Sequence, residues 1–219
     1  MADQVLARVT ELLPEMVEFL QELIRIPTVN PPGECYADFA EGTAARYRKL
    51  GYQVETITAE GHPDHTARHP RINVLARMEG GAPHPCVHFN GHMDVVPVGS
   101  GWIREPFGGE VRDGKVYGRG ASDMKAGIAA SLYAIEALRR AGIRLPGTVE
   151  QSATVDEESG GFTGVAYLAE HGYLHAGRQD HVIITEPHGP DRVCLGHRGV
   201  YWFDVIIHGH IAQDRKSVV

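Results

Sequence analysis

Four segments of the sequence place carboxylates or imidazoles at the end of an apolar run. The first is Asn90 to Asp94, directly after the run Cys86 to Phe89. In an extended segment His92 and Asp94, two residues apart, point the same way, so the carboxylate can orient the imidazole through its second nitrogen. Taken alone, a His-x-Asp pair fits a structural histidine equally well.

The second segment, Tyr117 to Gly127, is a glycine-rich turn that leads into a helical pattern and places Asp123 at the edge of the predicted sheet. A dinucleotide-binding fingerprint does not fit this segment, because it needs glycine at the position of Asp123. The third segment, Thr154 to Gly161, holds Glu157 beside Glu158. Consecutive side chains leave an extended backbone in opposite directions, so one can bind metal while the other acts as a free base. A solvated acidic turn is the alternative.

The fourth segment is Ile183 to Pro187, where Glu186 follows an apolar run and Pro187 stops it. Together the four segments supply one imidazole and several carboxylates, in order along the chain. This is a ligand set for two divalent ions, zinc or else cobalt or manganese, with a shared carboxylate between ions about 3.5–4 Å apart.

Alternating helices and strands must position these segments. Helical spacing predicts helices over Val5 to Ile24, with a kink or break at Pro14, over Ala37 to Leu50 and over Met124 to Ala141. The predicted strands are Tyr52 to Thr58, Ile72 to Met78, Cys86 to Asn90, Thr148 to Val155 and His181 to Thr185. The alternation predicts an α/β layer architecture, with the ligand crevice beyond the carboxyl ends of the strands.

The composition excludes several classes of protein. Of 219 residues, 42% are hydrophobic and 22% charged, which is typical of a globular chain. The formal charge of −7, without a cluster of basic residues, disfavours a nucleic-acid partner. No apolar run is long enough for a membrane span and no leader pattern opens the chain, so we expect no membrane partner and a cytoplasmic location. The three cysteines form no CxxC pair, which argues against a disulfide framework and a cysteine-based zinc site.

Three motifs resemble the signatures of the metallopeptidase and amidohydrolase family of acetylornithine deacetylase, succinyl-diaminopimelate desuccinylase, aminoacylase and glutamate carboxypeptidase. The motifs are Gly91 to Pro97, Gly118 to Lys125 and Asp156 to Gly161. The resemblance implies a three-layer αβα, zinc-exopeptidase-like catalytic domain with a mixed, largely parallel sheet. The start of a small α/β lid and dimerisation domain would follow it.

The same resemblance implies roles for the candidate metal ligands. His92 and Glu186 would bind one metal ion, Glu158 would bind the other, and Asp123 would bridge the two. Members of the family carry a further metal-binding histidine in a later section that this sequence lacks. We therefore expect little or no activity from these 219 residues alone.

The resemblance also implies a reaction. Asp94 would support His92, and Glu157 would be the general base that takes a proton from the water between the metals. The peptide bond between Asp123 and Met124 would be cis. The expected activity is hydrolysis of the amide bond of an N-acyl amino acid, by a protein that is a homodimer at full length. A carboxypeptidase or dipeptidase acting on a short peptide is the alternative with the same chemistry, and a catalytically silent scaffold is the alternative from another class.

The resemblance suggests three parts of the chain. Residues 1–197 would be the amino-terminal section of the catalytic domain, and residues 198–213 the start of the lid, with Tyr201 to Ile207 as a strand. Residues 214–219 read as the in-frame translation of a common sequencing adapter, so we expect this segment to be non-native. The adapter base A that precedes these codons, placed after CA of a histidine codon, would also account for Gln213, which stands where the family pattern has histidine.

Overall fold

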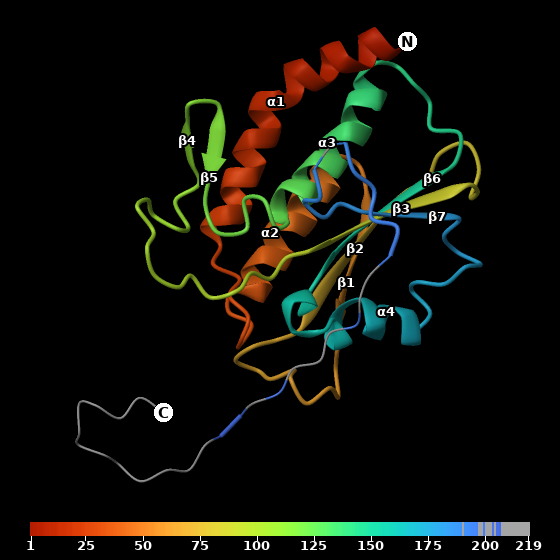
Figure 1. Ribbon diagram of the computed structural model, residues 1–219. Helices are drawn as coiled ribbons and strands as arrows, with labels where there is room; N and C mark the ends of the chain where they lie inside the picture. Colours follow the sequence, from red (N-terminus) through yellow and green to blue (C-terminus); the bar gives the residue numbers. More distant parts are fainter. Residues whose placement is uncertain (190, 197–198, 200–202, 204, 207–219) are drawn as a thin grey trace, which may run out of the picture. The chain divides into compact units, whose positions relative to one another are not determined.

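The computed structural model describes residues 1–189, 191–196, 199, 203 and 205–206 (Figure 1). The chain divides into two units, Met1–Pro187 and His188–Val219, and the first holds every element described below. The predicted strand Tyr201 to Ile207 falls largely outside the described residues, as does segment 214–219. The predicted division of the chain into three parts stays a prediction.

A five-stranded mixed sheet forms the centre of the first unit. Its order is β1-β2-β6-β3-β7. Strand β2 is antiparallel to both neighbours, whereas β6, β3 and β7 run parallel, so four of the five strands point the same way. The strands are β1 (Gln53–Thr58), β2 (Ile72–Met78), β3 (Cys86–His92), β6 (Thr148–Thr154) and β7 (His181–Ile184). The predicted strands are confirmed to within about two residues at each end.

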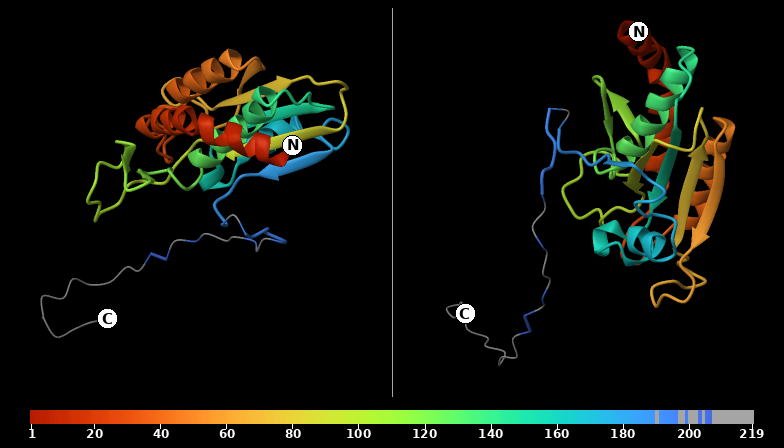
Figure 2. Two further views of the ribbon diagram at one scale, coloured as in Figure 1. Left: turned by 90° about the horizontal axis from the view of Figure 1, so that it is seen from above. Right: turned by 90° about the vertical axis from the view of Figure 1, so that its right-hand side faces the viewer.

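Three helices cover one face of this sheet: α1 (Ala2–Arg25), α2 (Tyr36–Lys49) and α3 (Lys125–Arg140). Helices α1 and α3 lie alongside one another in all views (Figures 1 and 2). Alternate residues of β2 and β6, such as Val74 and Ala153, join the apolar side chains of these helices in the main core. The opposite face carries a smaller cluster beneath α4 (Tyr167–Glu170), formed by Ile57, Leu75 and Leu168. The result is the three-layer architecture that the sequence predicts.

Helix α1 runs through Pro14 as one helix, so of the predicted kink or break at this residue, a break is excluded. A proline within a helix removes one backbone hydrogen bond. Leu12 before it and Phe19 after it both belong to the main core, and this packing holds the two halves as one helix. Among the described residues, no helix combines the length and apolarity that crossing a bilayer requires.

A small hairpin of β4 (Glu110–Arg112) and β5 (Lys115–Tyr117) is present in addition to the predicted strands. Its two-residue turn, Asp113-Gly114, has positive φ at both positions. An Asp-Gly pair is the usual signal for such a turn, so the signal was present in the sequence. The hairpin precedes the glycine-rich segment, and the Gln21 side chain of α1 donates to the Gly109 carbonyl oxygen at 2.7 Å beside it.

Candidate metal centre

The candidate ligands meet where the parallel strands end. His92 is the last residue of β3, and Glu157 begins the short 3-10 helix η1 (Glu157–Ser159) just after β6. Glu186 lies two residues beyond β7, and Asp123 precedes α3. Since β3, β6 and β7 point the same way, their carboxyl ends bring these side chains to one edge of the sheet.

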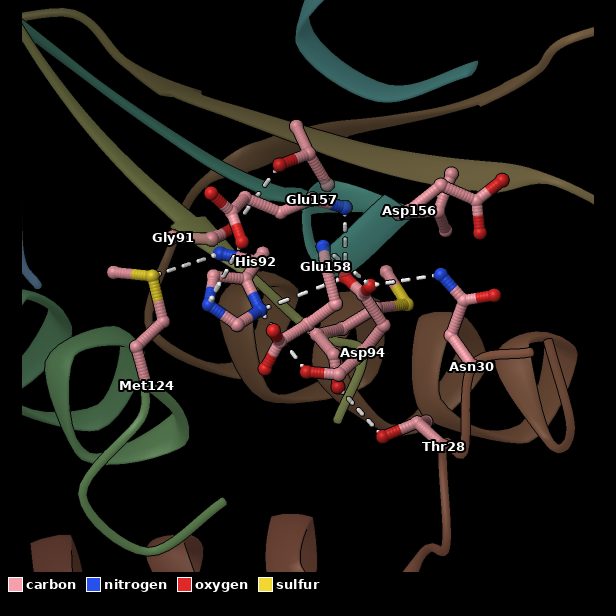
Figure 3. Close-up of polar contacts among 12 residues, drawn as sticks. Thr28, Asn30, Gly91, His92, Asp94, Met124, Asp156, Glu157 and Glu158 are labelled. Carbon is pink, nitrogen blue, oxygen red and sulfur yellow. Dashed lines mark hydrogen bonds and ion pairs between the residues drawn. The ribbon is translucent and has the colours of Figure 1, made fainter. Parts of the chain in front are cut away.

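The His92 imidazole lies at the centre of the cluster (Figure 3). Its Nε2 atom is 3.0 Å from Oδ1 of Asp123, 3.6 Å from Oε1 of Glu186 and 3.8 Å from Oε2 of Glu157. The donor atoms form two groups, each within 4.8 Å: His92 with Glu157 and Glu186, and His92 with Asp123 and Glu158. All four residues predicted as metal ligands therefore lie together, with Glu157 among them.

Burial and hydrogen bonding fix the orientation of His92, which is 2% exposed. Its backbone N–H donates to Sδ of Met124, and its Nδ1 lies 2.9 Å from the backbone carbonyl oxygen of Asp94 (Figure 3). The nearest carboxylate oxygen of Asp94 is 3.5 Å from Nδ1. A proton on Nδ1, donated to this carbonyl, leaves Nε2 free to bind a metal ion. The closer partner is thus the carbonyl group of Asp94 rather than its carboxylate, which the sequence analysis had favoured.

The Asp94 carboxylate is fully buried and organises the acidic turn after β6. Its Oδ1 accepts the backbone N–H of Glu157, and its Oδ2 accepts the backbone N–H of Glu158, both at 3.1 Å (Figure 3). The side-chain amide of Asn30 donates to the same Oδ2 at 3.1 Å and to Oγ of Ser159 at 2.8 Å. Asp94 therefore links the end of β3 to the backbone that carries the two glutamates.

The backbone at Glu157 and Glu158 is a turn of 3-10 helix, so the reasoning from an extended segment is wrong at this point. Asp156 adopts the left-handed conformation, with φ 59°, and this ends β6 and starts the turn. Glu157 and Glu158 nevertheless fall into different donor groups, one with Glu186 and the other with Asp123. The 3-10 turn, and not the pleat of a strand, therefore separates the Glu157 and Glu158 carboxylates.

The crowding of acidic groups shifts their ionisation. Burial, together with the nearby carboxylates of Asp123 and Glu157, raises the pKa of Glu186 to about 7 against the opposing effect of His92. Burial likewise raises the pKa of Glu158. Burial lowers the pKa of His92, but hydrogen bonds with Asp123 and Asp94 outweigh it and bring the pKa to about 11. The His92 imidazole thus lies within 4 Å of the carboxylates of Asp123, Glu157 and Glu186.

The residues fit a divalent metal pair. Oxygen and nitrogen donors converge from four separate segments at this one place. Imidazole and carboxylate ligands suit zinc, cobalt and manganese. Binding of a metal ion to Nε2 would release the proton that His92 otherwise carries.

Two residues that support the cluster, Asn30 and Met124, were not predicted to do so. Asn30 is 64 residues from Asp94 in the chain, and the contact of Met124 Sδ with the backbone N–H of His92 was not predicted. No short-range motif marks Asn30 as a partner of the site. The peptide bond between Asp123 and Met124 is cis, as the resemblance implies.

A family model described as Peptidase family M20/M25/M40 matches residues 88–208. This match covers more than half of the 219 residues. The chain belongs to this family. The M20 match includes every candidate ligand as well as Asp94 and Glu157.

Relatives of this M20 chain include proteins named succinyl-diaminopimelate desuccinylase. A succinyl-diaminopimelate desuccinylase of Methylobacterium radiotolerans is 36% identical over 208 residues, covering 90% of this chain and 50% of that protein. Another, of Wolinella succinogenes, is 34% identical over 214 residues, covering 94% of this chain and 53% of that protein. The chain therefore spans about half the length of these relatives.

Solved structures confirm the fold. An M20 family metallo-carboxypeptidase, Sso-CP2 from Sulfolobus solfataricus, is 27% identical with a TM-score of 0.64, over 78% of this chain and 37% of that one. The di-peptidase Dug1p from Saccharomyces cerevisiae is 22% identical with a TM-score of 0.73, over 83% of this chain and 40% of that one. The first unit has the fold of an M20 catalytic domain.

Proposed function

We propose that the chain is the amino-terminal, metal-binding section of a dinuclear hydrolase that cleaves the amide bond of an N-acyl amino acid. The observation that carries the proposal is the convergence of His92 with four carboxylates at the carboxyl ends of β3, β6 and β7. The 36% identity to a succinyl-diaminopimelate desuccinylase supports a succinylated or similarly acylated amino acid as the substrate.

His92, Asp123, Glu158 and Glu186 would hold two divalent ions, most simply zinc. Bound there, the ions would polarise the amide carbonyl and lower the pKa of the attacking water. Asp94 would position the groups that hold these ions. Its carbonyl oxygen orients the imidazole, and its carboxylate fixes the acidic turn.

Glu157 would serve as the general base. Its side chain is 52% exposed, so its carboxylate is open to substrate as well as close to the cluster. It would accept the proton that water loses on attacking the amide carbon. It would then deliver a proton to the departing nitrogen as the C–N bond breaks, giving a carboxylic acid and a free amine.

A carboxypeptidase or dipeptidase reaction is the second candidate, because the metallo-carboxypeptidase Sso-CP2 shares the fold at 27% identity. The two candidates differ in the group on the acyl side of the scissile bond. The homodimer and the cytoplasmic location of the full-length protein stay predictions.

The test is a substrate panel on the full-length protein reconstituted with zinc. N-succinyl and N-acetyl amino acids would be compared with dipeptides and with N-acylated peptides that end in a free carboxylate. We expect the highest kcat/KM on an N-acyl amino acid. Faster cleavage of peptides would favour the second candidate, and no hydrolysis of any compound by metal-loaded protein would refute both.

A further inference from the structure

A second buried cluster lies directly beside the acidic turn, centred on Asp156. This residue is 3% exposed and belongs to neither donor group of the metal centre. Its carboxylate accepts hydrogen bonds from Nε of Arg71 at 2.7 Å, from the hydroxyl of Tyr36 at 2.8 Å and from the hydroxyl of Thr163. The partners come from the start of α2, the residue before β2 and the turn of helix η2 (Phe162–Ala166). Asp156 thus joins three segments that are far apart in the chain.

Arg71 is held in place as firmly as Asp156. Its side chain is only 7% exposed, and its Nη1 donates to the carbonyl oxygen of His69 at 3.0 Å. Its guanidinium also lies over the Tyr36 ring, 5.5 Å from the centroid. Gly33 has φ +96°, and a Cβ atom there would come within 2.6 Å of Nη1. The loop before α2 therefore provides space for this one guanidinium.

Three consecutive acidic residues follow β6, and they point to different places. In Figure 3 the Asp156 side chain points away from His92, whereas Glu157 and Glu158 lie near it. The Asp156 carbonyl oxygen accepts the backbone N–H groups of Ser159 and Gly161, which closes the turn. The turn is thus fixed by two buried carboxylates: Asp94 holds its N–H groups, and Asp156 holds its start against Arg71.

We propose that Arg71, Asp156 and Tyr36 are positioning residues that select which of the three acids reach the metal centre. Arg71 forms a buried ion pair with Asp156, the first of the three acidic residues. This ion pair fixes the left-handed backbone at Asp156. Glu157 and Glu158 then project toward His92 with their spacing set. Without the ion pair between Arg71 and Asp156, three adjacent carboxylates would compete for the same metal ions. The proposal rests on the proposed function, since it assumes that Glu157 and Glu158 act at a metal centre.

The test compares variants of the full-length protein. Asp156→Asn keeps the side chain's shape and tolerates the left-handed backbone, but it removes the charge that Arg71 pairs with. Arg71→Met removes the cation, Arg71→Lys keeps the charge, and Tyr36→Phe removes only one hydroxyl donor. Each variant is titrated with Zn²⁺ by calorimetry, and its Tm, kcat and KM are measured.

The matched control is Arg77→Met. Arg77 of β2 pairs with buried Glu150 near the opposite end of β6, with Nη1 2.7 Å from Oε1. This variant removes one arginine from a buried carboxylate of β6, outside the metal centre, as Arg71→Met does beside Asp156. It reports what loss of a buried ion pair does to Tm alone.

We expect Asp156→Asn and Arg71→Met to lose about 10- to 100-fold in affinity for the more weakly bound zinc ion, and similarly in kcat, with KM within twofold. Arg71→Lys should recover part of the affinity, and Tyr36→Phe should show a smaller loss. Tyr36→Phe also keeps the proposal testable if the charge variants fail to fold. The control should lower Tm while leaving both affinities unchanged.

Variants that lower Tm as the control does, yet keep wild-type zinc affinity and kcat, would overturn the proposal. The same measurements distinguish failure of this proposal from failure of the proposed function. If the wild-type protein binds two zinc ions but cleaves no amide, the proposed function fails while zinc affinity still decides the positioning role. If the wild-type protein binds no divalent ion, both are refuted.

Discussion

Replacing Glu150 by glutamine should destabilise the protein in a pH-dependent way. The Glu150 side chain is fully buried in β6. Its carboxylate contacts Nη1 of Arg77 at 2.7 Å, Nη2 of Arg178 at 2.8 Å and Nε2 of Gln179 at 2.6 Å. Burial raises the pKa of Glu150, but its hydrogen bonds, with His88, Gln179 and the two arginines, outweigh this and hold the pKa at about 2.

The size of the destabilisation follows from the lowered pKa of Glu150. A fall of the pKa from 4.5 to about 2 would correspond to about 3 kcal/mol at 1.36 kcal/mol per pKa unit. Arg77 and Arg178 are 25% and 31% exposed, so solvent screens them and we expect about 2–3 kcal/mol at pH 7. Because the folded pKa is depressed, the contribution is complete above pH 4.5 and is lost as the pH falls through 2. At pH 3 it should be less than half of its value at pH 7.

The assay is urea unfolding of metal-free wild-type and Glu150→Gln protein at pH 7 and pH 3, so that metal release does not enter the comparison. The matched control is Glu22→Gln, which breaks a surface pair with Arg46 in which Glu22 is 47% exposed. We expect that control to cost about 0.5 kcal/mol or less at both pH values. An equal cost of Glu150→Gln at pH 7 and pH 3 would refute the reasoning.

Three further results are expected. Gly127→Ala should lower the free energy of unfolding by about 1–3 kcal/mol and lower kcat, because its Cβ would lie 2.4 Å from the carbonyl oxygen of Thr185, next to Glu186. Gly42→Ala, in an open position of α2, should instead raise the free energy of unfolding by about 0.5–1 kcal/mol. Urea unfolding measures both. Asp94→Asn should lower kcat and zinc affinity, measured by calorimetry, since an amide cannot accept both N–H groups of η1; unchanged affinity would contradict this. Chelation should abolish hydrolysis and lower Tm, and Zn²⁺, Co²⁺ or Mn²⁺ should restore both, whereas activity that survives chelation would argue against a metal centre.

The strands and the end of each strand were predictable because hydrophobic patterning is local. An apolar run ends where a polar residue such as His92 or Glu186 begins, and parallel strands then place these residues at one edge. The predicted strands and helices agree with the structure to within a few residues. The Asp113-Gly114 turn is a signal for the hairpin β4–β5 as well, although this hairpin was not among the predicted elements.

The supporting contacts were not predictable, because they join residues far apart in the chain. Arg71 and Asp156 are 85 residues apart, and no pattern in a single sequence pairs them. The conformation of the Glu157–Glu158 turn depends on that pair and on Asp94, so the expectation of an extended backbone there failed. The types of the ligands can be read from the sequence, whereas their geometry depends on tertiary contacts.

The central claim is that Glu157 is the base of a two-metal hydrolase while its neighbours bind the ions. The most direct test is Glu157→Ala in the full-length protein, with bound zinc and turnover of the best N-acyl amino acid measured on one preparation. We predict that turnover falls by about 10²- to 10⁴-fold while two zinc ions stay bound. Turnover near that of the wild type, or loss of solubility together with loss of metal, would contradict this assignment.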